Sequence, residues 1–180
     1  MLALMLYAEA RRPARRAADG AYVPLDRQDT ALWDDQLIAA AEALLREASA
    51  GGSSGRYQIE AAIQSAQIAR LVRSADTWPA IVALYDHLVA LTRSPVAQLN
   101  RAAALAETEG ADAALAALAP LGTDRRMASY QPYWAARAHL AARAGRRDDA
   151  YEAFTLAIGL ATDEAVRRYL QTQRDGLRNG

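Results

Sequence analysis

Segments with apolar residues at helical spacing follow one another along the chain, separated by short polar connections. One such segment runs to about Ser49, and it includes Trp33 on its apolar face. Asp29 is a suitable N-cap residue, so we expect this helix to begin there. Pro13 should end or kink an earlier helix, because its ring disfavours helical geometry at Arg12. The pattern predicts an all-α protein.

Two later segments repeat the same spacing. Ala103 and Gly110 recur as Ala138 and Gly145, an offset of 35 residues, and a step of 34 back from Ala103 gives Ala69. A small residue lets two helices approach closely, and a glycine can end the first of them in a left-handed conformation. The offset is close to the 34-residue period of tetratricopeptide (TPR) repeats. We therefore expect a TPR-like right-handed α-solenoid of about nine helices, in which the three alanines are buried.

The repeats suggest three parts in the chain. Residues 1–50 form a leading segment with the first helix pair, 51–55 form a Gly/Ser linker, and 56–180 form three TPR-like helix pairs and a C-terminal capping helix. The pairs are expected at about 57–91, 95–121 and 131–161, and the capping helix at about 163–177. The chain opens in the middle of a helical pattern without a capping residue, which predicts a longer helix that continues upstream.

Charge and composition narrow the function classes. The 21 basic and 21 acidic residues balance, so the whole chain has no field that would attract nucleic acid or an anionic membrane. Cysteine is absent, which excludes disulfides and thiolate chemistry. No apolar stretch approaches the ~20 residues of a membrane helix. The apolar residues 1–10 precede the arginines, whereas a signal peptide has its positive charge first, so we expect a cytoplasmic protein.

The sequence offers no set of residues typical of an enzyme. His87 and His139 stand on different expected helices, without carboxylates at metal-ligand spacing. Asp34 and Asp35 are adjacent, so on a helix they point about 100° apart and cannot share a proton. The glycine-rich 51–55 stretch lacks the G-K-[ST] of a phosphate-binding loop. We therefore expect no enzymatic activity, no metal and no cofactor.

The most specific motif is E-A-R-R-P-A-R-R at 9–16, followed by Asp19-Gly20 and by Q-D-T-A-L-W-D at 28–34. This order resembles the C-terminal extension of one large group of extracytoplasmic-function (ECF) sigma factors, where it reads roughly D-A-R-R-P-A-R, D-x-x-G, Q-D-R-x-x-W-D. Further matches lie at 57–63, 94–102 and 144–154, so the resemblance runs along essentially the whole chain. No segment resembles the two sigma domains that contact promoter DNA and core polymerase.

The resemblance implies a C-terminal regulatory domain of an ECF-type sigma factor, which modulates transcription initiation through protein contacts. Its partner in the full-length protein would be the sigma-factor core domains or RNA polymerase. It also implies a candidate hinge or protein contact made of Arg11, Arg12, Arg15, Arg16, Asp19, Gln28 and Asp29. In a hinge, the arginines would pair with Glu9, Asp19, Asp26 or Asp29. Because no aromatic residues are interleaved with the arginines, we expect no direct DNA binding by this chain.

In TPR-like stacks the first helices of the pairs line a concave groove where partners dock. Tyr57, Gln58, Gln64 and Asn100 are the candidate groove residues here. A free-standing TPR-like adaptor that binds a peptide or a small ligand in this groove is the alternative function. Sigma-type helices encoded upstream in the same reading frame would favour the sigma-factor hypothesis over the adaptor.

Overall fold

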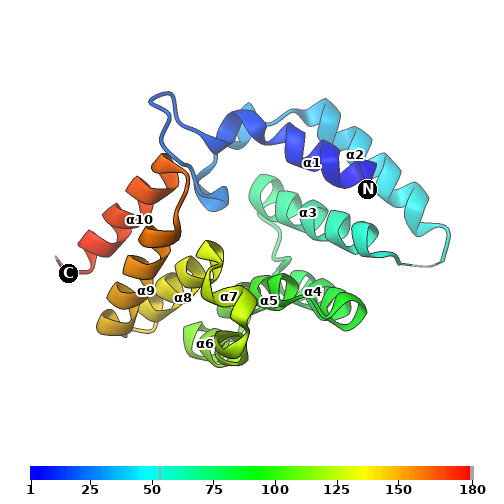
Figure 1. Ribbon diagram of the computed structural model, residues 1–180. Coiled ribbons are helices and arrows are strands. Elements are labelled where there is room, and N and C mark those ends of the chain that lie inside the picture. The colour runs from blue at the N-terminus through cyan, green and yellow to red at the C-terminus, as the bar shows by residue number, and fades with distance from the viewer. Residues whose placement is uncertain (53, 179–180) are drawn as a thin grey trace. The chain divides into compact units, whose positions relative to one another are not determined.

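The computed structural model describes residues 1–52 and 54–178, and this part of the chain is helical (Figure 1). It contains ten α-helices and four short 3-10 helices, with one isolated antiparallel bridge between Arg16 and Tyr22. The all-α prediction is confirmed. The α-helix beyond the expected nine is α7 (Arg125–Ala128), a single turn that Asp124 caps by accepting a hydrogen bond from the Arg126 N–H at 2.9 Å.

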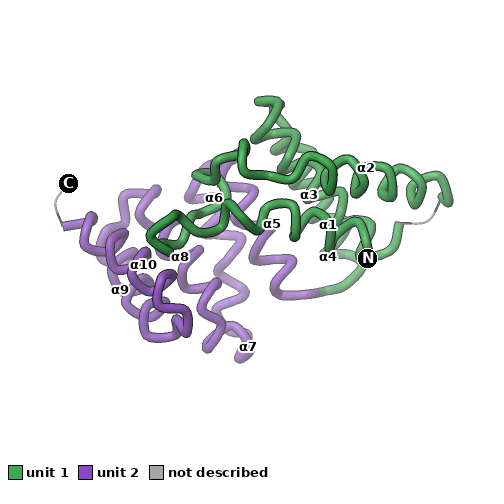
Figure 2. The backbone as a smooth tube through the Cα atoms, turned by 90° about the horizontal axis from the view of Figure 1, so that it is seen from above, with its two compact units in different colours: residues 1–93 green, residues 94–180 purple. Residues whose placement is uncertain are grey.

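The helices gather into two compact units, residues 1–93 and residues 94–180 (Figure 2). The N-terminal unit contains α1 (Leu2–Ala10), α2 (Asp35–Ser49), α3 (Arg56–Arg73) and α4 (Trp78–Thr92). The C-terminal unit contains α5 (Pro95–Thr108), α6 (Ala111–Leu118), α7, α8 (Gln131–Arg143), α9 (Arg147–Leu160) and α10 (Glu164–Gly176). The predicted pairs and capping helix correspond to α3–α4, α5–α6, α8–α9 and α10.

The predicted Gly/Ser linker at 51–55 joins α2 to α3 inside the N-terminal unit, and its residue Ser53 lies outside the described residues. Helix α1 packs against both α2 and α3 (Figure 1). The boundary between the compact units falls between Arg93 and Ser94.

The start of α2 differs from the prediction. Asp29 caps only the 3-10 helix Thr30–Leu32, by accepting from the Ala31 N–H at 2.9 Å. Asp34 then caps α2 and accepts from two N–H groups of its first turn, at 2.9 and 3.0 Å. The prediction of one helix from Asp29 to Ser49 is therefore wrong at its start, because two caps only five residues apart interrupt the helix. Trp33 lies between them, outside α2 and 5% exposed.

The helix pairs α5–α6 and α8–α9 of the C-terminal unit bury equivalent positions 36 residues apart. In the first helices the buried pairs are Ala97 and Tyr133, Ala102 and Ala138, Ala104 and Leu140, and Leu105 and Ala141. In the second helices and just beyond α6 they are Ala114 and Ala150, Leu118 and Phe154, and Leu121 and Ala157. Because the match extends over both helices, the pairs share one packing pattern.

This pattern corrects the predicted offset of 35. Ala138 is fully buried, but Ala103 is exposed and Ala69 is half-buried. Two residues connect α5 to α6 and three connect α8 to α9, so aligning Gly110 with Gly145 shifts the register by one. Both glycines have positive φ, 89° and 73°, and each lies two residues beyond the end of the preceding helix. After Gly145, the Arg146 N–H binds back to the Ala141 carbonyl of α8 at 2.9 Å.

The corrected register predicts different outcomes for two neighbouring alanines. Ala102→Leu should lower the free energy of unfolding by about 1–3 kcal/mol, because Ala102 is fully buried and the larger side chain overpacks its surroundings. Ala103→Leu should change the free energy of unfolding by no more than about 0.5 kcal/mol, because Ala103 is exposed. Chemical denaturation followed by circular dichroism measures both. The opposite order of effects would restore the offset of 35.

Candidate functional site

The arginine segment leaves α1 through a short 3-10 helix, Arg12–Arg15, in which Pro13 occupies a first-turn position. The loop that follows is held by its own hydrogen bonds. The Asp19 carboxylate accepts from the Ala21 N–H at 2.9 Å, and the Val23 N–H donates to the Arg15 carbonyl at 3.1 Å. Asp19 therefore has a local turn-forming role.

Two of the arginines bind back to α1. Arg12 Nε lies 2.9 Å from Glu9 Oε1, and these side chains are 74% and 54% exposed. Arg15 Nη2 donates to the Ala8 carbonyl at 2.8 Å. Glu9 is one of the predicted partners, but neither arginine side chain bonds to residues 19–29. These two side chains are therefore not paired with the Asp19–Asp29 segment, because the 3-10 turn leaves them within reach of the helix end that they follow.

Arg11 connects the segment to α3. Its Nε donates to the Tyr7 carbonyl at 3.3 Å, its Nη2 donates to Gln64 Oε1, and its guanidinium lies 6.0 Å from the centroid of the Trp33 ring. Burial lowers the pKa of Arg11, and the positive charge of Arg15 lowers it further. An arginine nevertheless keeps its charge at neutral pH. Arg11 thus makes a long-range structural contact with α3.

A second connection to α3 uses a carboxylate of the loop. Asp26 Oδ1 lies 2.5 Å from Arg70 Nη2, and the Arg70 side chain is only 17% exposed. Arg70 also donates to Gln67 and stacks on Trp78 of α4, with 4.4 Å between its guanidinium and the ring centroid. Asp26 was an expected partner for the arginine segment, but the cation that binds it comes from α3.

The same region contains buried polar atoms that find no hydrogen-bond partner in the described part of the protein. They are Tyr7 Oη, Gln28 Oε1 and Trp33 Nε1, although Gln28 Nε2 donates to the Val23 carbonyl at 3.3 Å. A buried polar group without a partner destabilises a protein by about 1–3 kcal/mol. Such atoms are uncommon and often mark functional regions.

The Tyr7 hydroxyl lies beside Glu42 of α2 and Ser65 of α3, which bind each other. Ser65 Oγ donates to Glu42 Oε1 at 2.6 Å. Burial raises the pKa of Tyr7, and the nearby Glu42 raises it further, so the hydroxyl remains protonated near neutral pH. It is a neutral donor without an aligned acceptor in the described protein.

The four predicted groove residues do not share one environment. Tyr57 is 47% exposed on α3. Gln58 donates to Ser49 Oγ at 3.2 Å, and Gln64 accepts a bond from the half-buried Arg11. Asn100 is exposed on α5, which belongs to the C-terminal unit. Two of the four are therefore engaged in internal bonds within the N-terminal unit.

The histidines lie apart from any acidic cluster. His87 is exposed on α4, and His139 packs edge-on against Phe154, with 5.0 Å between ring centroids. Within residues 1–52 and 54–178, no three His, Asp or Glu side chains are grouped as a metal site would require. None of the described helices has the length and apolar character needed to cross a membrane.

Residues 1–49 match DUF6596, a family of unknown function that is often C-terminal to sigma-70 factors. Over 178 residues the chain is 41% identical to Uncharacterized protein R00370 of Rhizobium meliloti (strain 1021). The alignment covers 98% of this chain and 41% of the relative, so the chain spans about two fifths of that protein's length. No solved structure is significantly similar to the chain.

Proposed function

We propose that this chain is the C-terminal regulatory domain of an ECF-type sigma factor and modulates transcription initiation through protein contacts. The observation that carries the proposal is the match of residues 1–49 to a family often found C-terminal to sigma-70 factors. The arginine segment, Asp26 and the unpartnered buried atoms all lie within these residues. A relative more than twice as long as the chain is consistent with a domain attached to others.

The surface chemistry of the leading segment supports a protein contact. Leu2 and Met5 are 56% and 58% exposed, and they lie three residues apart on α1, so they share one face of that helix. The same helix leads into the exposed side chains of Arg12 and Arg15. Exposed apolar residues beside arginines are typical of protein interfaces. We propose the sigma-factor core domains or RNA polymerase as the partner.

We further propose that the helix pairs are TPR-like repeats of a right-handed solenoid. The recurrence of buried positions in α5–α6 and α8–α9 supports this assignment, as does the packing of α8 against both α5 and α6. Repeats of this kind contact their immediate neighbours and share one packing pattern. An experimental structure in which successive pairs follow a left-handed course would contradict it.

On this proposal the isolated chain should not bind promoter DNA specifically. Its charges balance, so any weak electrostatic binding should disappear by physiological salt. A gel-shift titration at about 0.15 M salt, the physiological ionic strength, measures this. Tight, sequence-dependent binding under these conditions would exclude a role limited to protein contacts.

The decisive test uses the longer protein that, on this proposal, carries this chain. The reading frame upstream of residue 1 should encode sigma-type helices. An upstream frame without them would refute the proposal and favour the free-standing adaptor. In that protein, replacing both Arg12 and Arg15 by alanine should reduce a transcription reporter to the level seen when residues 1–180 are deleted. The thermal melt should change little, because both side chains are exposed and bind only α1.

The matched control for this test is Arg27→Ala. Arg27 is exposed in the leading segment and has no ion pair among the described residues. This variant should keep full reporter output. If Arg27→Ala and the double variant lost equal reporter output, the protein would be sensitive to charge in general and not to a specific contact. Normal output from the double variant would exclude the arginine segment as the contact.

A further inference from the structure

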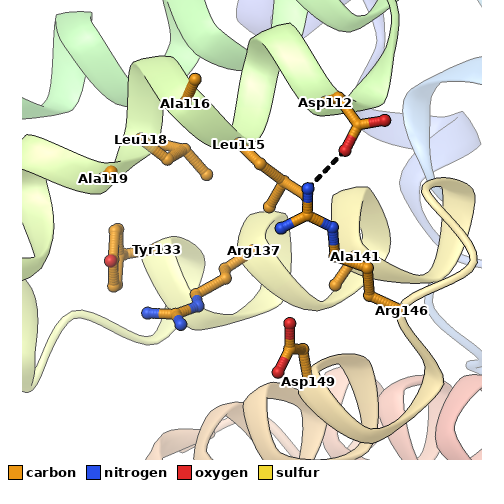
Figure 3. Close-up of a pocket in the computed structure, with 10 residues that line it drawn as sticks. All are labelled: Asp112, Leu115, Ala116, Leu118, Ala119, Tyr133, Arg137, Ala141, Arg146 and Asp149. Atoms are coloured by element: carbon orange, nitrogen blue, oxygen red, sulfur yellow. Dashed lines mark hydrogen bonds and ion pairs between the residues drawn. The ribbon is translucent and has the colours of Figure 1, made fainter.

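A pocket in the C-terminal unit has a wall of apolar side chains and a group of charged ones (Figure 3). It lies between α6, α8 and the beginning of α9, and its volume is about 360 Å³. Leu115 and Leu118 of α6 and Ala141 of α8 contribute to the apolar wall. Pockets of about 300–1,000 Å³ with an apolar lining and a few polar groups are typical of small-molecule sites. At this volume the pocket suits a small ligand.

The charges of the pocket do not all pair with one another. Arg146 Nη2 lies 2.6 Å from Asp112 Oδ1, so these two groups neutralise each other. The Asp149 carboxylate points into the cavity (Figure 3), and within the described residues it has no ion pair or hydrogen bond. The Arg137 guanidinium lies 5.7 Å from the centroid of the Trp134 ring and has no ion pair within the described residues. One cation and one anion therefore remain available to a ligand.

We propose that this pocket binds a free α-amino acid with an aliphatic side chain. Arg137 donates its parallel N–H groups to the ligand carboxylate, and Asp149 accepts from the ligand ammonium. The wall formed by Leu115, Leu118 and Ala141 removes the aliphatic side chain from water. A ligand with a single negative charge would be repelled by Asp149, and one with a single positive charge by Arg137, so the two available charges select a dipolar ligand.

The proposal is independent of the sigma-factor function, because the pocket lies in the C-terminal unit and the family match lies in residues 1–49. Isothermal titration of the whole chain with leucine should give saturable binding of one molecule per chain. Leucinamide lacks the carboxylate, N-acetylleucine lacks the ammonium and glycine lacks the side chain, so each should bind at least about tenfold more weakly. The dipeptide Leu-Leu holds its two charges further apart and should also bind more weakly.

Two variants locate the binding. Arg137→Gln and Asp149→Asn should each weaken leucine binding by about tenfold or more, because each removes one charged partner. The matched controls are Arg147→Gln and Asp148→Asn, which change exposed neighbours that do not line the pocket. These controls should bind leucine like the unchanged chain. Thermal melts should be similar for all four, since the altered side chains are exposed.

Several outcomes would overturn the proposal. They are the absence of leucine binding, equal affinity for leucine and N-acetylleucine, and unchanged affinity in Arg137→Gln and Asp149→Asn. A hollow of similar volume, about 350 Å³, lies between α2 and α3 and includes Arg73. Loss of leucine binding in Arg73→Gln, with normal binding in the α8 and α9 variants, would place the site there and reject the pocket of the C-terminal unit.

Discussion

Phe154→Ala is expected to lower the free energy of unfolding of the C-terminal unit by about 3–5 kcal/mol. Phe154 is 1% exposed and belongs to the core that α8, α9 and α10 share, together with Ala138 and Leu170. Its ring also meets the edge of His139, with 5.0 Å between centroids. Removing the ring exposes less apolar surface on unfolding and leaves a cavity between three helices. The loss of stability therefore includes the lost transfer free energy of the ring and the cost of the cavity. Urea unfolding followed by circular dichroism measures the change.

The control for Phe154→Ala is Leu156→Ala on the same helix. Leu156 is 46% exposed, so its truncation removes little buried surface and should change stability by about 0.5 kcal/mol or less. Both substitutions place alanine in α9, so differences in helix propensity largely cancel. Similar losses in the two variants would contradict the assignment of Phe154 to the shared core.

The burial of Phe154 could be predicted from the sequence because it depends on spacing within one helix. Ala150, Phe154 and Ala157 lie three and four residues apart, and all three are buried. The capping helix was predictable for a similar reason, since Asp163 is a local N-cap signal and accepts from the Ala165 N–H at 2.9 Å. Features encoded within one or two turns of helix are visible in the sequence.

The register between helix pairs was harder to predict, because glycines mark connections rather than packed surfaces. Gly110 stands directly before α6, whereas Arg146 separates Gly145 from α9. A difference of one residue in connection length therefore moved the predicted contact from Ala102 to Ala103. Buried positions would have given the correct register, but an alanine-rich helix hides them: Ala102, Ala103 and Ala104 are chemically identical and differ only in burial.

The partners of the arginine segment could not be read from the sequence, because they lie far away in the chain. Arg11 binds Gln64, 53 residues later, and Asp26 binds Arg70, 44 residues later. Both contacts depend on how α3 lies against the leading segment. The pocket of the C-terminal unit was missed for the same reason, since Arg137 and Asp149 come from different helices. Clusters of charge in the sequence favour pairs between residues close in the chain, and the Arg12–Glu9 pair is of that kind.

Arg11→Ala is expected to lower the free energy of unfolding of the N-terminal unit by about 2–3 kcal/mol, in the range found for hydrogen bonds to charged groups. The variant loses the bonds to Gln64 and to the Tyr7 carbonyl and the contact with Trp33. It also leaves the half-buried Gln64 amide oxygen without this donor. The loss is measured by chemical denaturation.

Two further variants separate the effect of the position of Arg11 from the effect of its charge. Arg12→Ala removes the same charge from an exposed pair with Glu9, so it should cost at most about 0.5 kcal/mol. Arg11→Lys keeps the charge but lacks the planar fork that reaches two acceptors at once, so its stability should fall between that of Arg11→Ala and that of the unchanged chain. If Arg11→Ala and Arg12→Ala unfolded alike, Arg11 would not connect the segment to α3. If Arg11→Lys matched the unchanged chain, charge alone would suffice and the fork geometry would contribute nothing.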